Sequence, residues 1–146
     1  MSSRHKMLKR IQKARERMRD VAASEVALAE QVRVRYDEKR KRCEEDRKDV
    51  EKLSYDKLGG AKTISDLELV GIDLSGADSL VDEASKELHS ASVARGLAAQ
   101  ELRARERALR LSEKLVSRSC EKRRQAADKA EQGMIDDIVA ARWSNK

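Results

Sequence analysis

The chain has 146 residues, of which 41% are charged and 2% aromatic, and it contains no proline and no phenylalanine. So few large apolar side chains exclude a conventional globular core of this size. Disorder of the whole chain is the competing interpretation, but 39% hydrophobic residues and a net charge of only +6 argue against it. The composition favours an all-α protein whose long helices bury a narrow seam.

The helical pattern is interrupted once, in the middle of the chain. Glycine costs about 1 kcal/mol within a helix, and four of the six glycines gather at Gly59, Gly60, Gly71 and Gly76. We therefore predict a single domain over residues 1–146, a long antiparallel two-helix coiled-coil hairpin with a short helix in the connecting tip. Helix one is expected at about 4–57, the tip at 58–78 with its short helix at about 66–70, and helix two at about 79–142.

Helix one begins at a basic segment that Ser2 or Ser3 can cap. Apolar residues recur along it at heptad spacing. One inward row takes Leu8, Ala22, Ala29, Tyr36, Cys43 and Val50, and the other takes Ile11, Met18, Val32 and Leu53. Arg15, Glu25, Lys39 and Asp46 also fall on these rows, so we expect the half nearer the break to be held weakly, and either to splay or to pair charges across the helices.

The break carries two patterns that are typical of helix starts. Ser65 with Glu68 predicts the start of a short tip helix that Gly71 ends, and Ser79 with Asp82 predicts the start of helix two. Between them lies the densest apolar cluster of the chain: Ile64, Leu67, Leu69, Val70, Ile72 and Leu74. Two interpretations of this cluster stay open, because its side chains can fold back onto the seam or bind a partner.

Helix two is expected to be the longer helix and to extend past the start of helix one, at the end where the termini meet. Near its end the apolar spacing shifts towards Met134, Ile138 and Ala141, which indicates a stutter in the heptad pattern. Its facing rows are Val81, Ala84, Leu88, Ala91, Ala98, Leu102, Leu109, Val116, Ala126 and Ala130.

Basic residues dominate the first 19 residues, where eight Lys or Arg accompany one acid, Glu16. The helix dipole disfavours cations at a helix start, so we infer that they serve an acidic partner. Nucleic acid, an anionic membrane surface, an acidic protein ring or groove, and a merely solvated charged face are the four interpretations. Nucleic acid is the least supported, because the few aromatic residues do not alternate with the cations.

Several kinds of site are not expected. No apolar run approaches the roughly 20 residues of a membrane span, so we expect no direct membrane insertion. A hairpin would hold Cys43 and Cys120 too far apart for a disulfide, and His5 and His89 lack a second ligand at metal-binding spacing. Both histidines are expected to be solvated or at the edge of the seam. We expect no metal, no cofactor and no enzyme activity, because two paired helices offer no pocket for catalysis.

Residues 8–31 resemble the opening of the FliJ/YscO family, the small stalk proteins of flagellar and virulence type III secretion systems. The likeness rests on a basic start, on Leu8 and Ile11 one helical turn apart, on an Arg-rich turn and on an Ala/Glu-rich run. Length, the lack of proline and the single central break agree over the whole chain. The resemblance implies an antiparallel two-helix coiled coil whose joined termini enter the pore of a hexameric ATPase.

The same resemblance implies a non-enzymatic central stalk, cytoplasmic and peripheral to the inner membrane, that couples the hexameric secretion ATPase to the inner-membrane export gate protein. Export chaperones are further implied partners, and nucleic acid is not among them. The implied residues that bind the ATPase ring are Arg4, Lys6, Lys9, Arg10, Lys13, Arg17, Arg118 and Lys122, and those that bind the export gate are Ile64, Leu67, Leu69 and Val70.

A self-associating coiled-coil adaptor or scaffold is the alternative function. In that interpretation the polar interruptions of the seam, Lys39, Asp46 and Arg105, specify a partner helix. A stable dimer in solution would favour the scaffold, whereas a monomer would favour the stalk.

Overall fold

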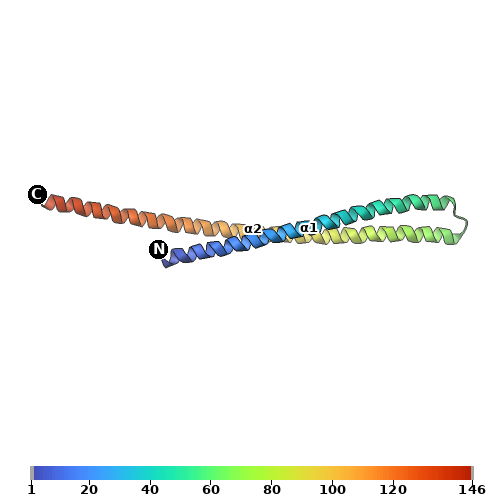
Figure 1. The fold of residues 1–146 in the computed structure, drawn as a ribbon, viewed down its shortest axis with the longest axis horizontal. Coiled ribbons are helices and arrows are strands. Elements are labelled where there is room, and N and C mark those ends of the chain that lie inside the picture. Colours follow the sequence, from blue (N-terminus) through green and yellow to red (C-terminus); the bar gives the residue numbers. More distant parts are fainter. Residues whose placement is uncertain (1, 146) are drawn as a thin grey trace. The chain divides into compact units, whose positions relative to one another are not determined.

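Two long helices packed against each other make up the chain in the computed structural model, which describes residues 2–145 (Figure 1). Helix α1 spans Ser3–Gly59 and helix α2 spans Ile64–Ser144. The prediction of an all-α protein is confirmed. The predicted cap is also present, because the Ser2 hydroxyl accepts a hydrogen bond of 3.2 Å from the backbone N–H of His5.

The chain groups into two compact units, and each contains a segment of both helices. Residues 22–102 form the turn unit, in which the chain passes from α1 to α2. Residues 1–21 and 103–146 form the terminal unit, of which 2–21 and 103–145 are described. The expectation of a single domain stays a prediction.

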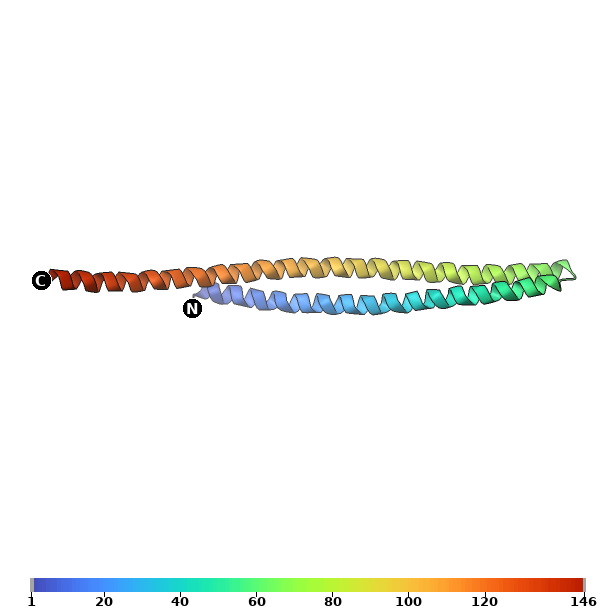
Figure 2. The same cartoon turned by 90° about the horizontal axis from the view of Figure 1, so that it is seen from above.

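Within the turn unit the two helix segments run antiparallel and lie side by side (Figure 2). Ion pairs join Glu30 to Arg95, Lys39 to Glu87 and Arg47 to Asp78, so the residue number on α2 falls as that on α1 rises. The α2 side of the seam is a row of mainly small side chains that recur every seven residues, which allows close helix packing. The buried members of this row are Val70, Ala77, Ala84 and Ala91.

The turn itself is built by a cap that the sequence analysis misplaced. Thr63 precedes α2, and its hydroxyl accepts a hydrogen bond from the N–H of Asp66, while the Asp66 carboxylate accepts bonds from the N–H groups of Lys62 and Thr63. This reciprocal arrangement is a capping box, in which Thr63 rather than Ser65 is the cap. These backbone N–H groups also lower the pKa of Asp66.

The separate short tip helix at 66–70 is absent among the described residues, because those residues form the first turns of α2. Gly71, expected to end that helix, and Ser79, expected to cap helix two, both lie inside α2. No glycine takes a positive φ, so none acts as a helix stop of that kind. The seam residues Val70, Ala77 and Ala84 recur through this segment and favour a continuous helix.

The inward rows of α1 are partly different from the predicted ones. The row of Leu8, Ala22 and Val50 is buried or half-buried as expected. The second predicted row is wrong, since Ile11 and Leu53 are 37% and 58% exposed. Its place is taken by a more polar row, whose buried or half-buried members are His5, Gln12, Arg19, Val26, Arg33, Arg40 and Ser54.

In the terminal unit, α2 continues past the start of α1 (Figures 1 and 2). Every residue from 121 to 145 is exposed, as expected where α2 passes the start of α1. Ala126 and Ala130 therefore do not face α1, which corrects their assignment to the seam. The other predicted facing residues of α2 in this unit, Leu109 and Val116, are buried or half-buried.

Candidate functional site

The first turn of α1 is attached to α2 in the terminal unit by His5, a residue expected to be solvated or at the seam edge. Its side chain is only 1% exposed. The Nδ1 atom lies 3.0 Å from the Ser119 hydroxyl, and Nε2 lies 4.0 Å from the Cys120 sulfur. The burial of His5 could have been predicted from one feature of the sequence. His5 lies three residues before Leu8, which is the spacing of a seam position.

The environment of His5 favours the neutral imidazole. Burial lowers the pKa of His5 first, and the positive charges of Arg123 and Lys9 lower it further. Because the protonated ring would have to donate from both nitrogens among cations, protonation opposes the packing of α1 on α2 here. The attachment of the α1 start is therefore sensitive to pH.

A second polar contact crosses the same seam at Arg15, which the sequence analysis treated as an interruption. Its Nη1 atom donates to the Ala108 carbonyl at 2.9 Å and to the Ser112 hydroxyl at 2.5 Å. Ser112 is 2% exposed and also donates to the Ala108 carbonyl. Arg15 thus has a structural role that fixes the register of the two helices in this unit.

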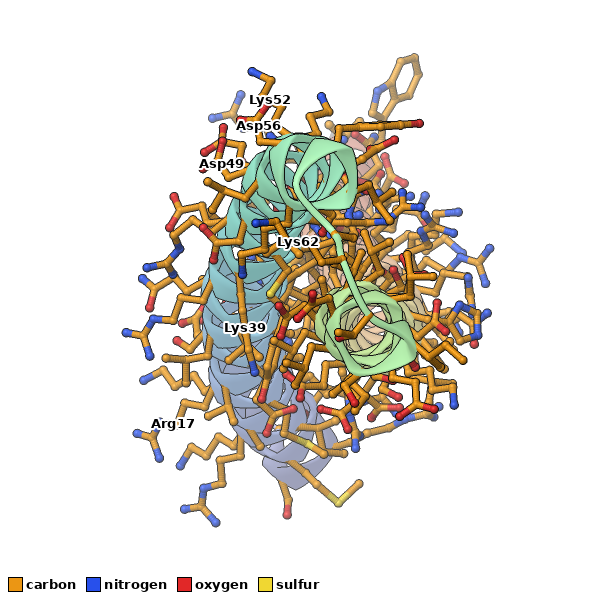
Figure 3. All side chains as sticks on the ribbon, turned by 90° about the vertical axis from the view of Figure 1, so that its right-hand side faces the viewer. Arg17, Lys39, Asp49, Lys52, Asp56 and Lys62 are labelled. Atoms are coloured by element: carbon orange, nitrogen blue, oxygen red, sulfur yellow. The ribbon has the colours of Figure 1, made fainter. Side chains whose placement is uncertain are left out.

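The predicted ring-binding cations are all exposed and all belong to the terminal unit. Arg4, Arg118 and Lys122 line one groove between α1 and α2, together with Leu8 and Leu115. The others, Lys6, Lys9, Arg10, Lys13 and Arg17, lie outside that groove along α1. None of the eight makes an ion pair with a described residue, and Arg17 extends away from its helix (Figure 3).

Charge differs sharply between the two units. By sequence the terminal unit has 20 Lys or Arg against 9 Asp or Glu, a net charge of +11, and the turn unit has 13 against 18, a net charge of −5. A surface with a large excess of one charge repels similar surfaces and attracts a partner of the opposite charge. The terminal unit is therefore the candidate site for an acidic partner.

The predicted gate-binding residues divide into two kinds in the turn unit. Ile64, Leu67 and Leu69 are 50–76% exposed, whereas Val70 is only 5% exposed and belongs to the seam. Neither interpretation of the apolar cluster therefore holds for all of it. Three side chains are free to contact a partner, and Val70 is not accessible to one.

Metal-binding clusters and membrane-spanning helices are absent among the described residues. No group of three or more His, Cys, Asp or Glu side chains there is placed to hold a metal ion. Cys43 and Cys120 are free thiols. None of the described helices is long and apolar enough to cross a membrane.

Fold and surfaces define a class of protein: a pair of long helices with a cationic terminal unit, suited to contacting other proteins. The family model of the flagellar FliJ protein matches residues 5–146, and the chain belongs to the FliJ family. The expected family is thus confirmed, and its members are non-catalytic components of flagellar type III export. No curated protein and no solved structure matches the chain.

Proposed function

We propose that this chain is a non-enzymatic central stalk of a bacterial type III export apparatus, inserting its terminal unit into a hexameric ATPase ring. The observation that carries the proposal is the set of exposed cations in the terminal unit, which have no ion-pair partner among the described residues. Cations at a helix start oppose the helix dipole by a few tenths of a kcal/mol or more. An acidic surface inside a ring would compensate this cost on binding.

The turn unit would point towards the inner-membrane export gate, on the cytoplasmic side. Ile64, Leu67 and Leu69 support this part of the proposal, because three exposed apolar side chains close together at a turn are a usual protein contact. Val70 is not part of the proposed contact, because its side chain is buried. Across the whole chain, α1 and α2 would act as one antiparallel coiled-coil hairpin that transmits changes in the ring. Export chaperones would be secondary partners.

The test is the turnover and hexamerisation of the export ATPase with added chain. Reversing three terminal cations, Lys9→Glu, Arg10→Glu and Lys13→Glu, should reduce stimulation at least tenfold, because each reversal replaces attraction to the ring by repulsion. A matched control reverses Lys48, Lys52 and Lys62 to Glu in the turn unit. All three are exposed, and Lys52 projects from α1 on the side away from α2 (Figure 3).

Equal stimulation by both triple variants would contradict ring insertion by the terminal unit. An ATPase whose hexamerisation and turnover ignore the wild-type chain would contradict the stalk function as a whole. A stable dimer in light scattering at several concentrations would favour the self-associating scaffold instead.

A further inference from the structure

The terminal unit has a second apolar row on α1 that does not face α2. Its members recur at alternating steps of four and three residues, which is the spacing of a coiled-coil seam. Their large side chains are 37–59% exposed. They are Met7, Ile11, Ala14, Met18 and Val21.

Helix α2 has a matching row in the same unit, at Ala104, Ala108, Leu111 and Leu115, again at steps of four and three residues. The two alanines of this row are half-buried. Leu111 and Leu115 are 55% and 37% exposed. Together the two rows form what we call the apolar strip. When the large side chains of an apolar strip have seam spacing and no described residue covers them, the strip is suited to packing against a further helix.

Two contacts place both rows on the same side of the α1–α2 seam. The Met18 sulfur accepts a hydrogen bond from Arg105 Nη1 at 4.0 Å, and Arg15 Nη1 donates to the Ala108 carbonyl. In an antiparallel pair with this register, Ile11 lies level with Leu115 and Met18 level with Ala108.

The borders of the apolar strip are basic on both helices. One helical step outside it lie Arg10 and Arg17 on α1, and Arg107 and Lys114 on α2, all of them exposed. None of these four makes an ion pair with a described residue.

The opposite side of the seam is mixed in charge, because Lys9 shares its heptad position with Glu16. Glu16 lies there, where it accepts a hydrogen bond from Gln12 on the His5 row. Heptad positions put Glu106 and Glu113 on the same side. The four border residues of the strip are all cations, whereas the opposite side carries both signs of charge.

We propose that the apolar strip binds one amphipathic helix of another protein, whose apolar stripe is flanked by Asp and Glu, as the third helix of a coiled coil. Charge selects this occupant, because a second copy would bring two sets of cationic borders together. The proposal goes beyond the stalk function and does not rest on it, since it needs no ATPase.

The test measures binding of the full chain to a synthetic three-heptad peptide with leucine at both seam positions and glutamate at the flanking positions. Met7→Ser with Leu111→Ser should weaken binding at least tenfold, and both positions are exposed enough to leave the α1–α2 seam intact. Val34→Ser with Val93→Ser is the control, since both residues are exposed and lie in the turn unit. Circular dichroism verifies that both variants remain helical.

Charge is tested separately. Arg17→Gln with Lys114→Gln should weaken binding several-fold and reduce its salt dependence, and a peptide with lysine at the flanking positions should not bind. Four outcomes overturn the proposal: equal affinity of strip and control variants, equal binding of the lysine peptide, strip-dependent binding to vesicles of anionic phosphatidylglycerol without peptide binding, or a dimer that the strip variant abolishes. Failure here leaves the ATPase assay free to succeed, so the two proposals are separable.

Discussion

The turn unit and the terminal unit are built from the same two helices but neutralise their charges differently. In the turn unit, cations and anions of α1 and α2 pair across the seam, as in Lys39 with Glu87 and Arg47 with Asp78. In the terminal unit, the contacts of His5 and Arg15 across the seam use neutral groups or carbonyls as acceptors. The turn unit pairs charges across its seam and keeps a net charge of −5, whereas the terminal unit keeps a net charge of +11.

The largest expected effect concerns the seam of the terminal unit, which depends on a large side chain where the turn unit uses alanines. Leu109 is 3% exposed, so Leu109→Ala should lower the free energy of unfolding by about 2–4 kcal/mol. Leu111→Ala, at an exposed position, should change it by less than about 0.5 kcal/mol. Urea unfolding followed by circular dichroism measures both, and equal losses would contradict the assigned seam.

A smaller effect of opposite sign is expected in the turn unit. Gly71 lies inside α2 with a negative φ and no atom within 4 Å of where a Cβ would stand. Gly71→Ala should therefore raise the free energy of unfolding by about 0.5–1 kcal/mol, because it removes the helix penalty of glycine. A loss of stability in the same measurement would mean that the helix is broken at residue 71.

The attachment of the α1 start should weaken in acid. Because the pKa of His5 is lowered in the folded state, the unfolded state binds the proton more readily, and stability falls as the pH drops below the ordinary value of 6.5. The protection of the backbone amides of residues 6–10 against hydrogen exchange, corrected for the intrinsic effect of pH, should decrease as the pH falls from 7.5 to 5.5. The His5→Gln variant should lose this pH dependence. If the variant shows the same pH dependence as the wild type, a group other than His5 is responsible.

The smallest expected effect is that of added salt, which should change the local stability of the two units in opposite directions. Screening weakens the exposed ion pairs of the turn unit and relieves repulsion among the cations of the terminal unit. Raising sodium chloride from 0.05 to 0.5 M should slow amide exchange near Leu109 and accelerate it near Ala84. If salt changes exchange in the same direction at both sites, the contrast in charge between the two units is not the cause of the salt effect.

The sequence predicted the helical class, the family and most of the α2 seam, because heptad spacing without proline has few other solutions. It misassigned the second inward row of α1, since α1 has apolar residues on two faces and spacing alone does not tell which one meets α2. Ile11 and Met18 fit the apolar heptad pattern, whereas the polar His5 and Gln12 do not. Only the partner helix, with its register fixed by Arg15 and Ser112, decides between the faces.

The boundaries near the turn failed for a different reason. Glycine and serine are local signals of helix ends. The cost of glycine within a helix, about 1 kcal/mol, and the smaller cost of serine are outweighed when seam residues continue on both sides. Gly71 and Ser79 lie between Val70 and Ala84, which are both buried. The reciprocal cap of Thr63 and Asp66 was within reach of the sequence, because it has the same three-residue spacing as the pattern assigned to Ser65 and Glu68.

The central claim, that the cationic terminal unit engages the ATPase ring, is tested most directly by hydrogen–deuterium exchange of the full chain with and without the hexameric export ATPase. Insertion of the terminal unit into the ring predicts slower exchange in residues 4–21 and 103–124 on binding and unchanged exchange in residues 40–62. Protection confined to the turn unit, with the terminal unit unaffected, would contradict it.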